Sequence, residues 1–446
     1  MTERKKDRVL EPLAAPLDGA VRVPGDKSIS HRAVLFSAMA EGTSRVTGLL
    51  DSEDVRSSIR AARSLGAQVS LSVQADGSLA GGITGWGSDG PVQPEGVIDC
   101  GNSGTTVRLL MGVVAPWPIK VSLTGDDSLV KRPMRRIMTP LTKMGVRFEP
   151  EEAETLPLTV VGNPDIKAIT YDSPVASAQV KTAVMLAGTR AKGRTVVNEP
   201  APSRNHTELM LPEYGVKTTA SLHAASVTGP VILKASEVDV PGDPSSAAFI
   251  ACAALLKRGS GVQIENVSLA PTRIGFVRTL ERMGASIETR TIGAEGKEPK
   301  GVIEVAFTEN LVGCEVPPQH IASEIDEIPV LALVAARAKG VTVFRGVSEL
   351  TKKESNRLEA IIEGLGKLGV SAWTEARDED IDLFVEGHPG LSYPEGLVFD
   401  SYGDHRLAMT WALVGLCGDH PVAVKDFDCI NISFPQFVST LERLCS

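Results

Sequence analysis

The sequence predicts an α/β protein of two similar domains, each built from three repeated units with buried helices at its centre. Three observations lead to this prediction. The string VPGDKSISHR at residues 23–32 returns as VPGDPSSAAF at residues 240–249. A pattern of polar turn, apolar helix and valine-rich strand occurs six times along the chain. The 446 residues include 42 glycines and 28 prolines but only 4% aromatic residues, which indicates many short elements joined by turns.

The six turns recur at nearly constant intervals. They read VPGDKSISHR, DCGNSGTTVR, DSPVASAQVK, VPGDPSSAAF, ASEIDEIPV and DSYGDHRLAM. Their marker residues Pro24, Cys100, Pro174, Pro241, Ser323 and Asp400 lie 76, 74, 67, 82 and 77 residues apart. Spacing of this regularity is typical of repeated supersecondary units.

Each unit contains two kinds of helix. The first kind, as in AVLFSAMA at 33–40 and AAFIACAALL at 247–256, is apolar on nearly every side, which is typical of a buried helix. The second kind, as in DVRSSIRAARSLGA at 54–67, has apolar residues at helical spacing and ends near a glycine that fits a C-terminal cap. We therefore expect the first helices inside each domain and the second helices outside.

The position of the second VPGD predicts the domain boundaries, because it opens the fourth unit. One domain is expected to comprise residues 25–240, and the other residues 1–24 with 241–446, including a strand around Gly19–Val23. Each polar turn precedes a buried helix, whose free N–H groups and dipole favour an anion. We therefore expect an active site in the cleft between the domains.

Composition excludes several classes of function. The net charge of −9 does not favour binding to nucleic acid or to an acidic membrane, which attract positively charged proteins. No segment reads as a signal peptide or a membrane span, so a cytoplasmic protein is expected. Six cysteines lie scattered without a CxxC pair, and seven histidines show no ligand spacing, so we expect free thiols and no metal. We further expect a monomer.

Several turns carry polar side chains that helix capping does not require. These are Lys27, Ser28, Arg32, Arg108, Gln179, Lys181, His405 and Arg406, with further clusters at Lys131–Arg132 and at Lys353, Glu354 and Arg357. Any one such cluster could be a solvated face, but their recurrence at equivalent points favours substrates with phosphate and carboxylate groups. No GxxxxGK[ST] loop or Rossmann spacing indicates a nucleotide. For VPGDPSSAAF, simple helix capping is the favoured interpretation.

The same strings carry a family resemblance. GDKSISHR, GNSGTTVRLL, TGDDSLVKRPM, SAQVK, PGDPSSAAF, IDEIPVLA, KKESNR and GDHRLAM occur in the order seen in the 5-enolpyruvylshikimate-3-phosphate synthase family, and the chain resembles that family along nearly its whole length. The resemblance implies two domains of three βαβαββ-type units each, arranged as an inverse α/β barrel, and no cofactor. It implies transfer of the enolpyruvyl group of phosphoenolpyruvate to the 5-hydroxyl of shikimate 3-phosphate, through a tetrahedral intermediate, with release of phosphate.

The resemblance also assigns roles to residues through the matching motifs. Shikimate 3-phosphate would be held by Lys27, Ser28, Arg32, Ser177, Ala178, Gln179 and Arg204. Phosphoenolpyruvate would be held by Gly104, Arg132, Arg357 and Arg406, with contacts from Lys27 and Gln179 and with Asn102 and Lys353 beside them. Asp326, which would also contact substrate, would accept the proton of the attacking hydroxyl, and Glu354 would protonate the methylene carbon, with Lys27 as a third catalytic residue.

The chemistry itself needs such a pair, because an alcohol loses a proton while an enol carbon gains one. Asp326 and Glu354 lie in the stretch that mixes carboxylates with basic residues. Periodicity does not choose Asp326 over Glu327, and the choice rests on the family motif. Glu324 and Glu327 are expected to be solvated or capping carboxylates.

The chain departs from the family pattern at a few positions. Ile432 stands where many members have a lysine, Asn356 where aspartate is common, and Ala178 where one branch has serine. Gly104 stands where glyphosate-tolerant members often have alanine, so we expect glyphosate to inhibit in competition with phosphoenolpyruvate.

Two alternatives remain at this stage. The sister enolpyruvyl transferase that acts on UDP-N-acetylglucosamine has a cysteine in the loop corresponding to TGDDSLVKRP, and here no cysteine lies between Cys100 and Cys252. A non-catalytic protein that senses a phosphorylated metabolite would not need Asp326 and Glu354 beside an anion, because like charges repel. With basic residues in both halves, we expect the free protein to be open and to close on its substrates.

Overall fold

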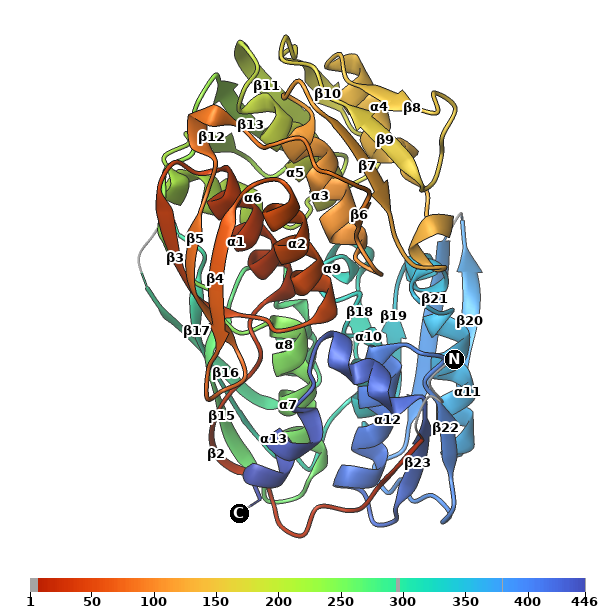
Figure 1. Cartoon of the computed structure of the whole chain (residues 1–446). Helices are drawn as coiled ribbons and strands as arrows, with labels where there is room; N and C mark the ends of the chain where they lie inside the picture. Colours follow the sequence, from red (N-terminus) through yellow and green to blue (C-terminus); the bar gives the residue numbers. More distant parts are fainter. Residues whose placement is uncertain (1–6, 294–296, 379, 446) are drawn as a thin grey trace. The chain divides into compact units, whose positions relative to one another are not determined.

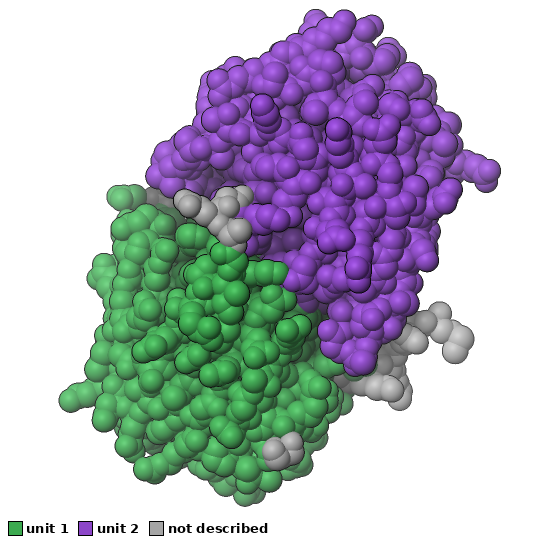
Figure 2. All heavy atoms as spheres, turned by 90° about the vertical axis from the view of Figure 1, so that its left-hand side faces the viewer, with its two compact units in different colours: residues 1–24, 242–295, 299–446 green, residues 25–241, 296–298 purple. Residues whose placement is uncertain are grey.

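The computed structural model describes residues 7–293, 297–378 and 380–445 of the chain. The chain divides into two compact units, coloured separately in Figure 2. Unit 1 comprises residues 1–24, 242–295 and 299–446, and unit 2 comprises residues 25–241 and 296–298. Among the described residues, no helix is both long enough and apolar enough to cross a membrane.

Unit 2 contains three four-stranded sheets, each associated with one buried and one amphipathic helix (Figure 1). The first repeat has β14 (Glu237–Asp239), α1 (Lys27–Met39), β3 (Thr43–Leu49), α2 (Glu53–Ser64), β4 (Gln68–Val73) and β5 (Leu79–Thr84). The second has β6 (Ile98–Asp99), α3 (Gly104–Val114), β7 (Lys120–Thr124), α4 (Arg135–Lys143), β8 (Arg147–Glu149) and β9 (Leu158–Val161). The third has β10 (Thr170–Asp172), α5 (Ala178–Gly188), β11 (Gly193–Asn198), α6 (His206–Met210), β12 (Thr218–Ala220) and β13 (Ala224–Gly229). Short 3₁₀ helices are η1 (Gly87–Asp89), η2 (Leu129–Lys131) and η3 (Leu211–Tyr214).

Unit 1 repeats this plan with three further sheets. The fourth repeat has β2 (Asp18–Arg22), α7 (Pro244–Leu256), β15 (Gly261–Ser268), α8 (Gly275–Arg282), β16 (Ser286–Ile292) and β17 (Lys300–Ala306). The fifth has β18 (Glu315–Val316), α9 (Pro318–Ile321), α10 (Ile328–Ala335), β19 (Gly340–Phe344), η4 (Ser348–Lys352), α11 (Arg357–Lys367), β20 (Ala372–Arg377) and β21 (Asp380–Gly387). The sixth has β22 (Val398–Asp400), α12 (His405–Cys417), β23 (Val422–Lys425), η5 (Phe427–Ile432) and α13 (Phe437–Arg443), and β1 (Arg8–Leu10) completes its sheet.

In four of the six repeats, the strand before the buried helix pairs in parallel with the strand after it. In the first and fourth repeats, the parallel partner of the strand after the helix comes from another part of the chain, as β14 for β3 and β2 for β15. Ile98 of β6 faces Leu123 of β7, and Val316 of β18 faces Phe344 of β19. A helix that joins two adjacent parallel strands is a βαβ crossover. In the first five repeats an antiparallel pair follows, as with β4 and β5 or β20 and β21. The predicted α/β fold class of repeated βαβαββ units is confirmed.

The two VPGD strings mark the points at which the chain passes from one unit to the other. Strand β2 precedes the first string and pairs with β15 of unit 1, whereas β14 precedes the second string and pairs with β3 of unit 2. The turn itself is tightly packed, because a Cβ added to Gly25 would lie 2.0 Å from the carbonyl oxygen of Gly48. Only glycine fits there. The repeated string is therefore a chain crossing that also starts a buried helix.

The buried helices form the core of each unit. Every residue of α7 is buried, and α7, α10 and α12 contact one another. In unit 2, α3 contacts both α1 and α5, and Val34, Leu35 and Phe36 of α1 are fully buried. All six cysteines are free thiols, as predicted.

Candidate functional site

The polar turns start five of the six buried helices with a side-chain cap. The capping residues are Asp26 for α1, Ser103 for α3, Ser177 for α5, Asp243 for α7 and Asp404 for α12. Each cap accepts a hydrogen bond from one backbone N–H, and the other N–H groups of the first helical turn remain available. These helix starts place the sequence-predicted residues of each unit next to a partial positive charge.

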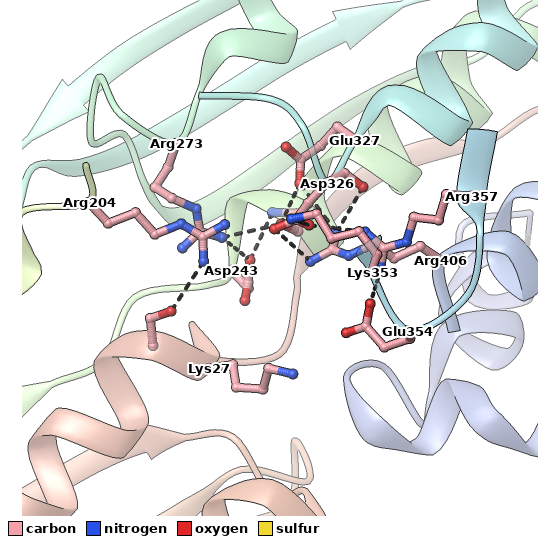
Figure 3. A network of polar contacts seen from close by, with 12 residues as sticks. Lys27, Arg204, Asp243, Arg273, Asp326, Glu327, Lys353, Glu354, Arg357 and Arg406 are labelled. Carbon is pink, nitrogen blue, oxygen red and sulfur yellow. Dashed lines mark hydrogen bonds and ion pairs between the residues drawn. The ribbon is translucent and has the colours of Figure 1, made fainter. Parts of the chain in front are cut away.

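In the first turn, Lys27 and Ser28 each have a polar partner within unit 2. The Lys27 Nζ donates to Asp54 Oδ2 at 3.1 Å, and its side chain is 26% exposed. The Ser28 hydroxyl accepts from Arg204 Nη1 at 3.4 Å, and Figure 3 labels both Arg204 and Lys27. The adjacent residues Lys27 and Ser28 and the distant Arg204, all predicted to hold one substrate, therefore lie around the start of α1.

Arg32 lies deeper in unit 2 than a surface anion site would require. Its Nε donates to Thr207 Oγ1 at 2.8 Å, its Nη1 to the Ser28 carbonyl at 2.9 Å and its Nη2 to Thr182 Oγ1 at 2.8 Å. Burial lowers the pKa of the guanidinium to about 10, and the negative charge of Glu208 opposes that shift. Arg32 thus braces the backbone of Ser28 in addition to supplying positive charge.

The second turn brings Asn102 and Arg132 together. Arg132 Nη2 donates to Asn102 Oδ1 at 2.9 Å, and Asn102 Nδ2 donates to Asp126 Oδ2 at 2.7 Å. Gly104 begins α3 beside them, and a Cβ there would lie 3.5 Å from Arg132 Nη1 and 3.1 Å from Arg108 Nη1. The absence of a side chain at Gly104 leaves space directly in front of two guanidinium groups.

Gln179 is held from both ends of its amide. Arg108 Nη1 donates to Gln179 Oε1 at 2.8 Å, and Gln179 Nε2 donates to Thr105 Oγ1 at 3.1 Å. Burial lowers the pKa of Arg108 to about 9, and the positive charges of Arg136 and Arg132 act in the same direction. Arg108 is therefore a support for Gln179, which links the second turn to the third.

Lys181 does not serve as an exposed donor at the start of α5, as the turn pattern had indicated. Its side chain is only 5% exposed, and Nζ lies 2.8 Å from both Glu199 Oε2 and Glu208 Oε1. A buried ammonium requires such compensation, because removing a charge from water is costly unless it is paired. The prediction for Lys181 was wrong because its two carboxylate partners come from later segments of the chain.

In unit 1, Asp326 is surrounded by three cations (Figure 3). Its Oδ1 accepts from Arg357 Nη1 at 3.0 Å and lies 3.4 Å from Lys353 Nζ. Its Oδ2 lies 3.7 Å from Arg406 Nη2. Three residues predicted for the site are therefore brought together around the carboxylate of a fourth, and the four come from two turns and the Lys353–Arg357 cluster.

Arg357 also binds the second predicted catalytic carboxylate. Its Nη2 donates to Glu354 Oε2 at 2.6 Å and its Nε to Asp404 Oδ2 at 2.7 Å. Burial alone would raise the pKa of Glu354, but the positive charges of Arg357 and His405 hold it well below its usual range. The pKa of Arg357 is raised by its three carboxylate neighbours although burial opposes this. One guanidinium thus joins both proton-transfer candidates.

The second VPGD turn caps α7 through Asp243, as the favoured interpretation had it, and its residues also make further polar contacts. Asp243 pairs with Arg273 Nη2 at 2.8 Å, and the Ser245 hydroxyl donates to Glu327 Oε1 at 2.5 Å. Glu327 Oε1 also accepts from Arg406 Nη1 at 3.3 Å (Figure 3). Ser245 of this turn is therefore linked to Arg406 by hydrogen bonds that both residues make to Glu327.

Glu324 and Glu327 are buried, so the expectation of solvated or capping carboxylates was wrong. Glu324 is 1% exposed and accepts from Thr279 Oγ1 at 3.1 Å, and burial raises its pKa to about 8. Burial also raises the pKa of Glu327, and the charge of Arg406 opposes that shift. Partners from α7, α8 and α12 make this burial possible, and the local sequence pattern did not show them.

Two of the residues that depart from the family pattern, Asn356 and Ile432, lie in unit 1. Asn356 caps α11, because its side chain accepts from the Glu359 N–H at 3.4 Å, a role that aspartate also fills. Ile432 is the last residue of η5 and is partly buried. Nothing in the structure explains the replacement of lysine there.

In the described ranges, no three or more His, Cys, Asp or Glu side chains are arranged to hold a metal ion. Sequence reasoning missed several supporting residues, namely Asp54, Glu199, Glu208, Ser245, Arg273 and Asp404. The one signal that pointed to them is general, because a buried charged side chain needs charged or hydrogen-bonding partners.

The structure first defines a class of protein. An EPSP synthase from Acinetobacter baumannii has a TM-score of 0.86 with 36% identity, and the match covers 98% of each chain. The enolpyruvyl transferase NikO from Streptomyces tendae has a TM-score of 0.74 with 18% identity, over 98% of this chain and 97% of that one. The fold is therefore that of the enolpyruvyl transferases.

Sequence comparison then specifies the family. A family model described as EPSP synthase (3-phosphoshikimate 1-carboxyvinyltransferase) matches residues 13–441. A 3-phosphoshikimate 1-carboxyvinyltransferase of Bacillus thuringiensis is 41% identical over 440 residues, covering 98% of this chain and 99% of the relative. One of Roseobacter denitrificans is 43% identical over 436 residues, covering 96% and 94%. The chain belongs to the EPSP synthase family, which confirms the resemblance and the enzyme class predicted from the motifs.

Proposed function

We propose that this chain transfers the enolpyruvyl group of phosphoenolpyruvate to the 5-hydroxyl of shikimate 3-phosphate and releases phosphate. Family membership supports the reaction. The observation that carries the assignment of roles is the Arg357 guanidinium, which binds both Asp326 and Glu354. A proton acceptor, a proton donor and an anion-binding group are thereby gathered in one small volume.

The substrates divide between the two groups of residues. Lys27, Ser28, Arg32, Ser177, Ala178, Gln179 and Arg204 of unit 2 bind shikimate 3-phosphate. Gly104, Asn102 and Arg132 of unit 2 and Lys353, Arg357 and Arg406 of unit 1 bind phosphoenolpyruvate, with further contacts from Lys27 and Gln179. Planar guanidinium groups suit both carboxylate and phosphate, because each can donate two parallel hydrogen bonds.

The proton balance of the reaction follows from the two carboxyl groups. Glu354 gives a proton to the methylene carbon of phosphoenolpyruvate, and Asp326 takes the proton of the hydroxyl whose oxygen bonds to C2. The resulting tetrahedral adduct then returns a methyl proton to Glu354, and phosphate leaves with the proton held by Asp326. Each carboxyl group ends the cycle as it began.

The proposal includes a way for Glu354 to gain its proton. In the arrangement described here Arg357 holds the pKa of Glu354 low, so the carboxyl group is ionised. An anionic substrate that binds Arg357 competes with Glu354 for the same guanidinium. The pKa of Glu354 then rises, because the favourable charge pair is weakened.

Phosphate release tests the proposal. Purified protein is given phosphoenolpyruvate with either shikimate 3-phosphate or UDP-N-acetylglucosamine, and the Asp326→Asn and Glu354→Gln variants are assayed in parallel. We expect release only with shikimate 3-phosphate and a large loss in both variants. Release only with the sugar nucleotide, or full activity in either variant, would show that the reaction or the roles are misassigned.

A further inference from the structure

A buried charge cluster lies behind the residues proposed to bind shikimate 3-phosphate. It consists of Lys181, Glu199 and Glu208 in unit 2, whose side chains are 5%, 3% and 4% exposed. The Lys181 Nζ lies 2.8 Å from one oxygen of each carboxylate. We call these three residues the Lys181 triad.

Glu199 contacts two separate segments of the proposed binding site. It directly follows β11, and its Oε1 accepts the backbone N–H of Ser177 at 2.8 Å. Its Oε2 accepts the Ser203 hydroxyl at 2.8 Å, in addition to Lys181 Nζ. Ser177 caps α5 immediately before Ala178, and Ser203 immediately precedes Arg204. One carboxylate is therefore bound to both segments.

The charge of the triad argues against a direct role in binding an anion. Two carboxylates and one ammonium carry a formal net charge of −1, which repels a phosphate group. Glu208 Oε2 is buried, without a hydrogen-bond partner among the described residues. Keeping three ionisable groups this deep is costly, and a well-packed apolar cluster of similar volume would serve stability as well. The geometry at Glu199 offers a specific reason for them.

We propose that Glu199, which Lys181 holds in place, is a positioning residue. It keeps the Ser177–Gln179 segment and the Ser203–Arg204 segment in the relative arrangement that binds shikimate 3-phosphate. This inference rests on the proposed function. Glu199 does not touch the substrate and acts through the Ser177 backbone and the Ser203 side chain. Hydrogen bonds to an ionised acceptor are stronger than neutral ones, which suits this task.

The Glu199→Gln variant removes the interaction with little change in volume. A glutamine retains one acceptor oxygen but presents an NH₂ group to the Lys181 ammonium or to the Ser177 N–H, so that two donors face each other. The Ser203→Ala variant removes only the link to the second segment. Tyr214→Phe is the matched control, because it removes a buried hydrogen bond to the Ser37 hydroxyl (2.9 Å) in the same unit that involves none of the triad residues.

The experiment uses the whole chain. Calorimetry gives the dissociation constant of shikimate 3-phosphate, steady-state kinetics gives the Michaelis constants of both substrates, and thermal unfolding gives the thermal midpoint. We expect Glu199→Gln to raise the dissociation constant about tenfold or more and Ser203→Ala about threefold. The double variant should match Glu199→Gln alone within about twofold, because both changes break the same link. The Michaelis constant of phosphoenolpyruvate should rise less than the dissociation constant of shikimate 3-phosphate, because Gln179 alone of the two positioned segments is assigned a contact with phosphoenolpyruvate. Tyr214→Phe should lower the thermal midpoint without changing the dissociation constant or either Michaelis constant.

The results separate this inference from the proposed function. If the parent protein binds shikimate 3-phosphate but both variants bind it equally well, the positioning role is overturned while the proposed function stands. If the Michaelis constants of both substrates rise equally, or if Tyr214→Phe has the same effect, the triad is only structural. A parent protein that does not bind shikimate 3-phosphate overturns both. If Glu199→Gln does not fold, the Ser203→Ala variant decides the outcome by the same criteria, provided that its thermal midpoint equals that of the parent protein.

Discussion

Adding one methyl group at Gly104 is expected to weaken inhibition by glyphosate, which should compete with phosphoenolpyruvate. A Cβ at Gly104 would lie 3.1 Å from Arg108 Nη1 and 3.5 Å from Arg132 Nη1. Arg108 cannot withdraw freely, because it is 5% exposed and donates to Gln179 Oε1 at 2.8 Å. The methyl group therefore takes up space in front of the two guanidinium groups, where an anionic inhibitor must approach.

The size of the effect follows from packing. Forcing one extra carbon into a filled site costs about 1–3 kcal/mol, which corresponds to roughly a five- to 150-fold rise in the inhibition constant. Folding should not suffer, because Gly104 begins α3 and alanine favours a helix over glycine by up to about 1 kcal/mol.

The assay is phosphate release at several phosphoenolpyruvate concentrations with increasing glyphosate, for the parent and Gly104→Ala. Gly366→Ala in α11 is the control, because an added Cβ there meets nothing within 4 Å. Equal inhibition constants in the parent and Gly104→Ala, or a parent that is unaffected by millimolar glyphosate, would refute the reasoning.

Three further predictions concern the carboxylates of unit 1. Asp326→Asn and Glu354→Gln should each lower kcat by about 10²- to 10⁴-fold in the phosphate-release assay, and a loss below tenfold would argue against proton transfer by that residue. When phosphoenolpyruvate binds, Arg357 should release Glu354, and the protein should take up protons from the buffer. The binding enthalpy measured by calorimetry should therefore vary with the ionisation enthalpy of the buffer, and an enthalpy that is the same in all buffers would contradict proton uptake. Because the pKa of Glu324 is raised from 4.5 to about 8, the folded protein keeps a proton that the unfolded chain loses, so stability should fall as pH rises through that window. Glu324→Gln should flatten the dependence of the thermal midpoint on pH, and an unchanged slope would show that Glu324 is not its cause.

The repeated units could be predicted because the signal is local. A polar turn followed by a helix that is apolar all round repeats six times, and all thirteen residues of α7 are indeed buried. The motif strings also selected Asp326, Glu354 and Arg357, which the structure brings into contact. Local pattern and family motif therefore agree with the fold and with the grouping of these residues.

The partners of the buried charges could not be predicted, because they come from distant parts of the chain. Lys181 on α5 meets Glu199 after β11 and Glu208 on α6, and Glu327 before α10 meets Ser245 on α7. A charged residue beside a turn has the same local pattern whether water or another helix surrounds it. Only the packing of the helices decides whether such a residue faces solvent or a buried partner.

The most direct test of the central claim is mass spectrometry of the acceptors after a competition. Purified protein is incubated with phosphoenolpyruvate and equal amounts of shikimate 3-phosphate and UDP-N-acetylglucosamine. The proposed function predicts that only shikimate 3-phosphate gains the mass of one carboxyvinyl group, in an amount equal to the phosphate released. A carboxyvinyl group on the sugar nucleotide, or phosphate release without any modified acceptor, would contradict it.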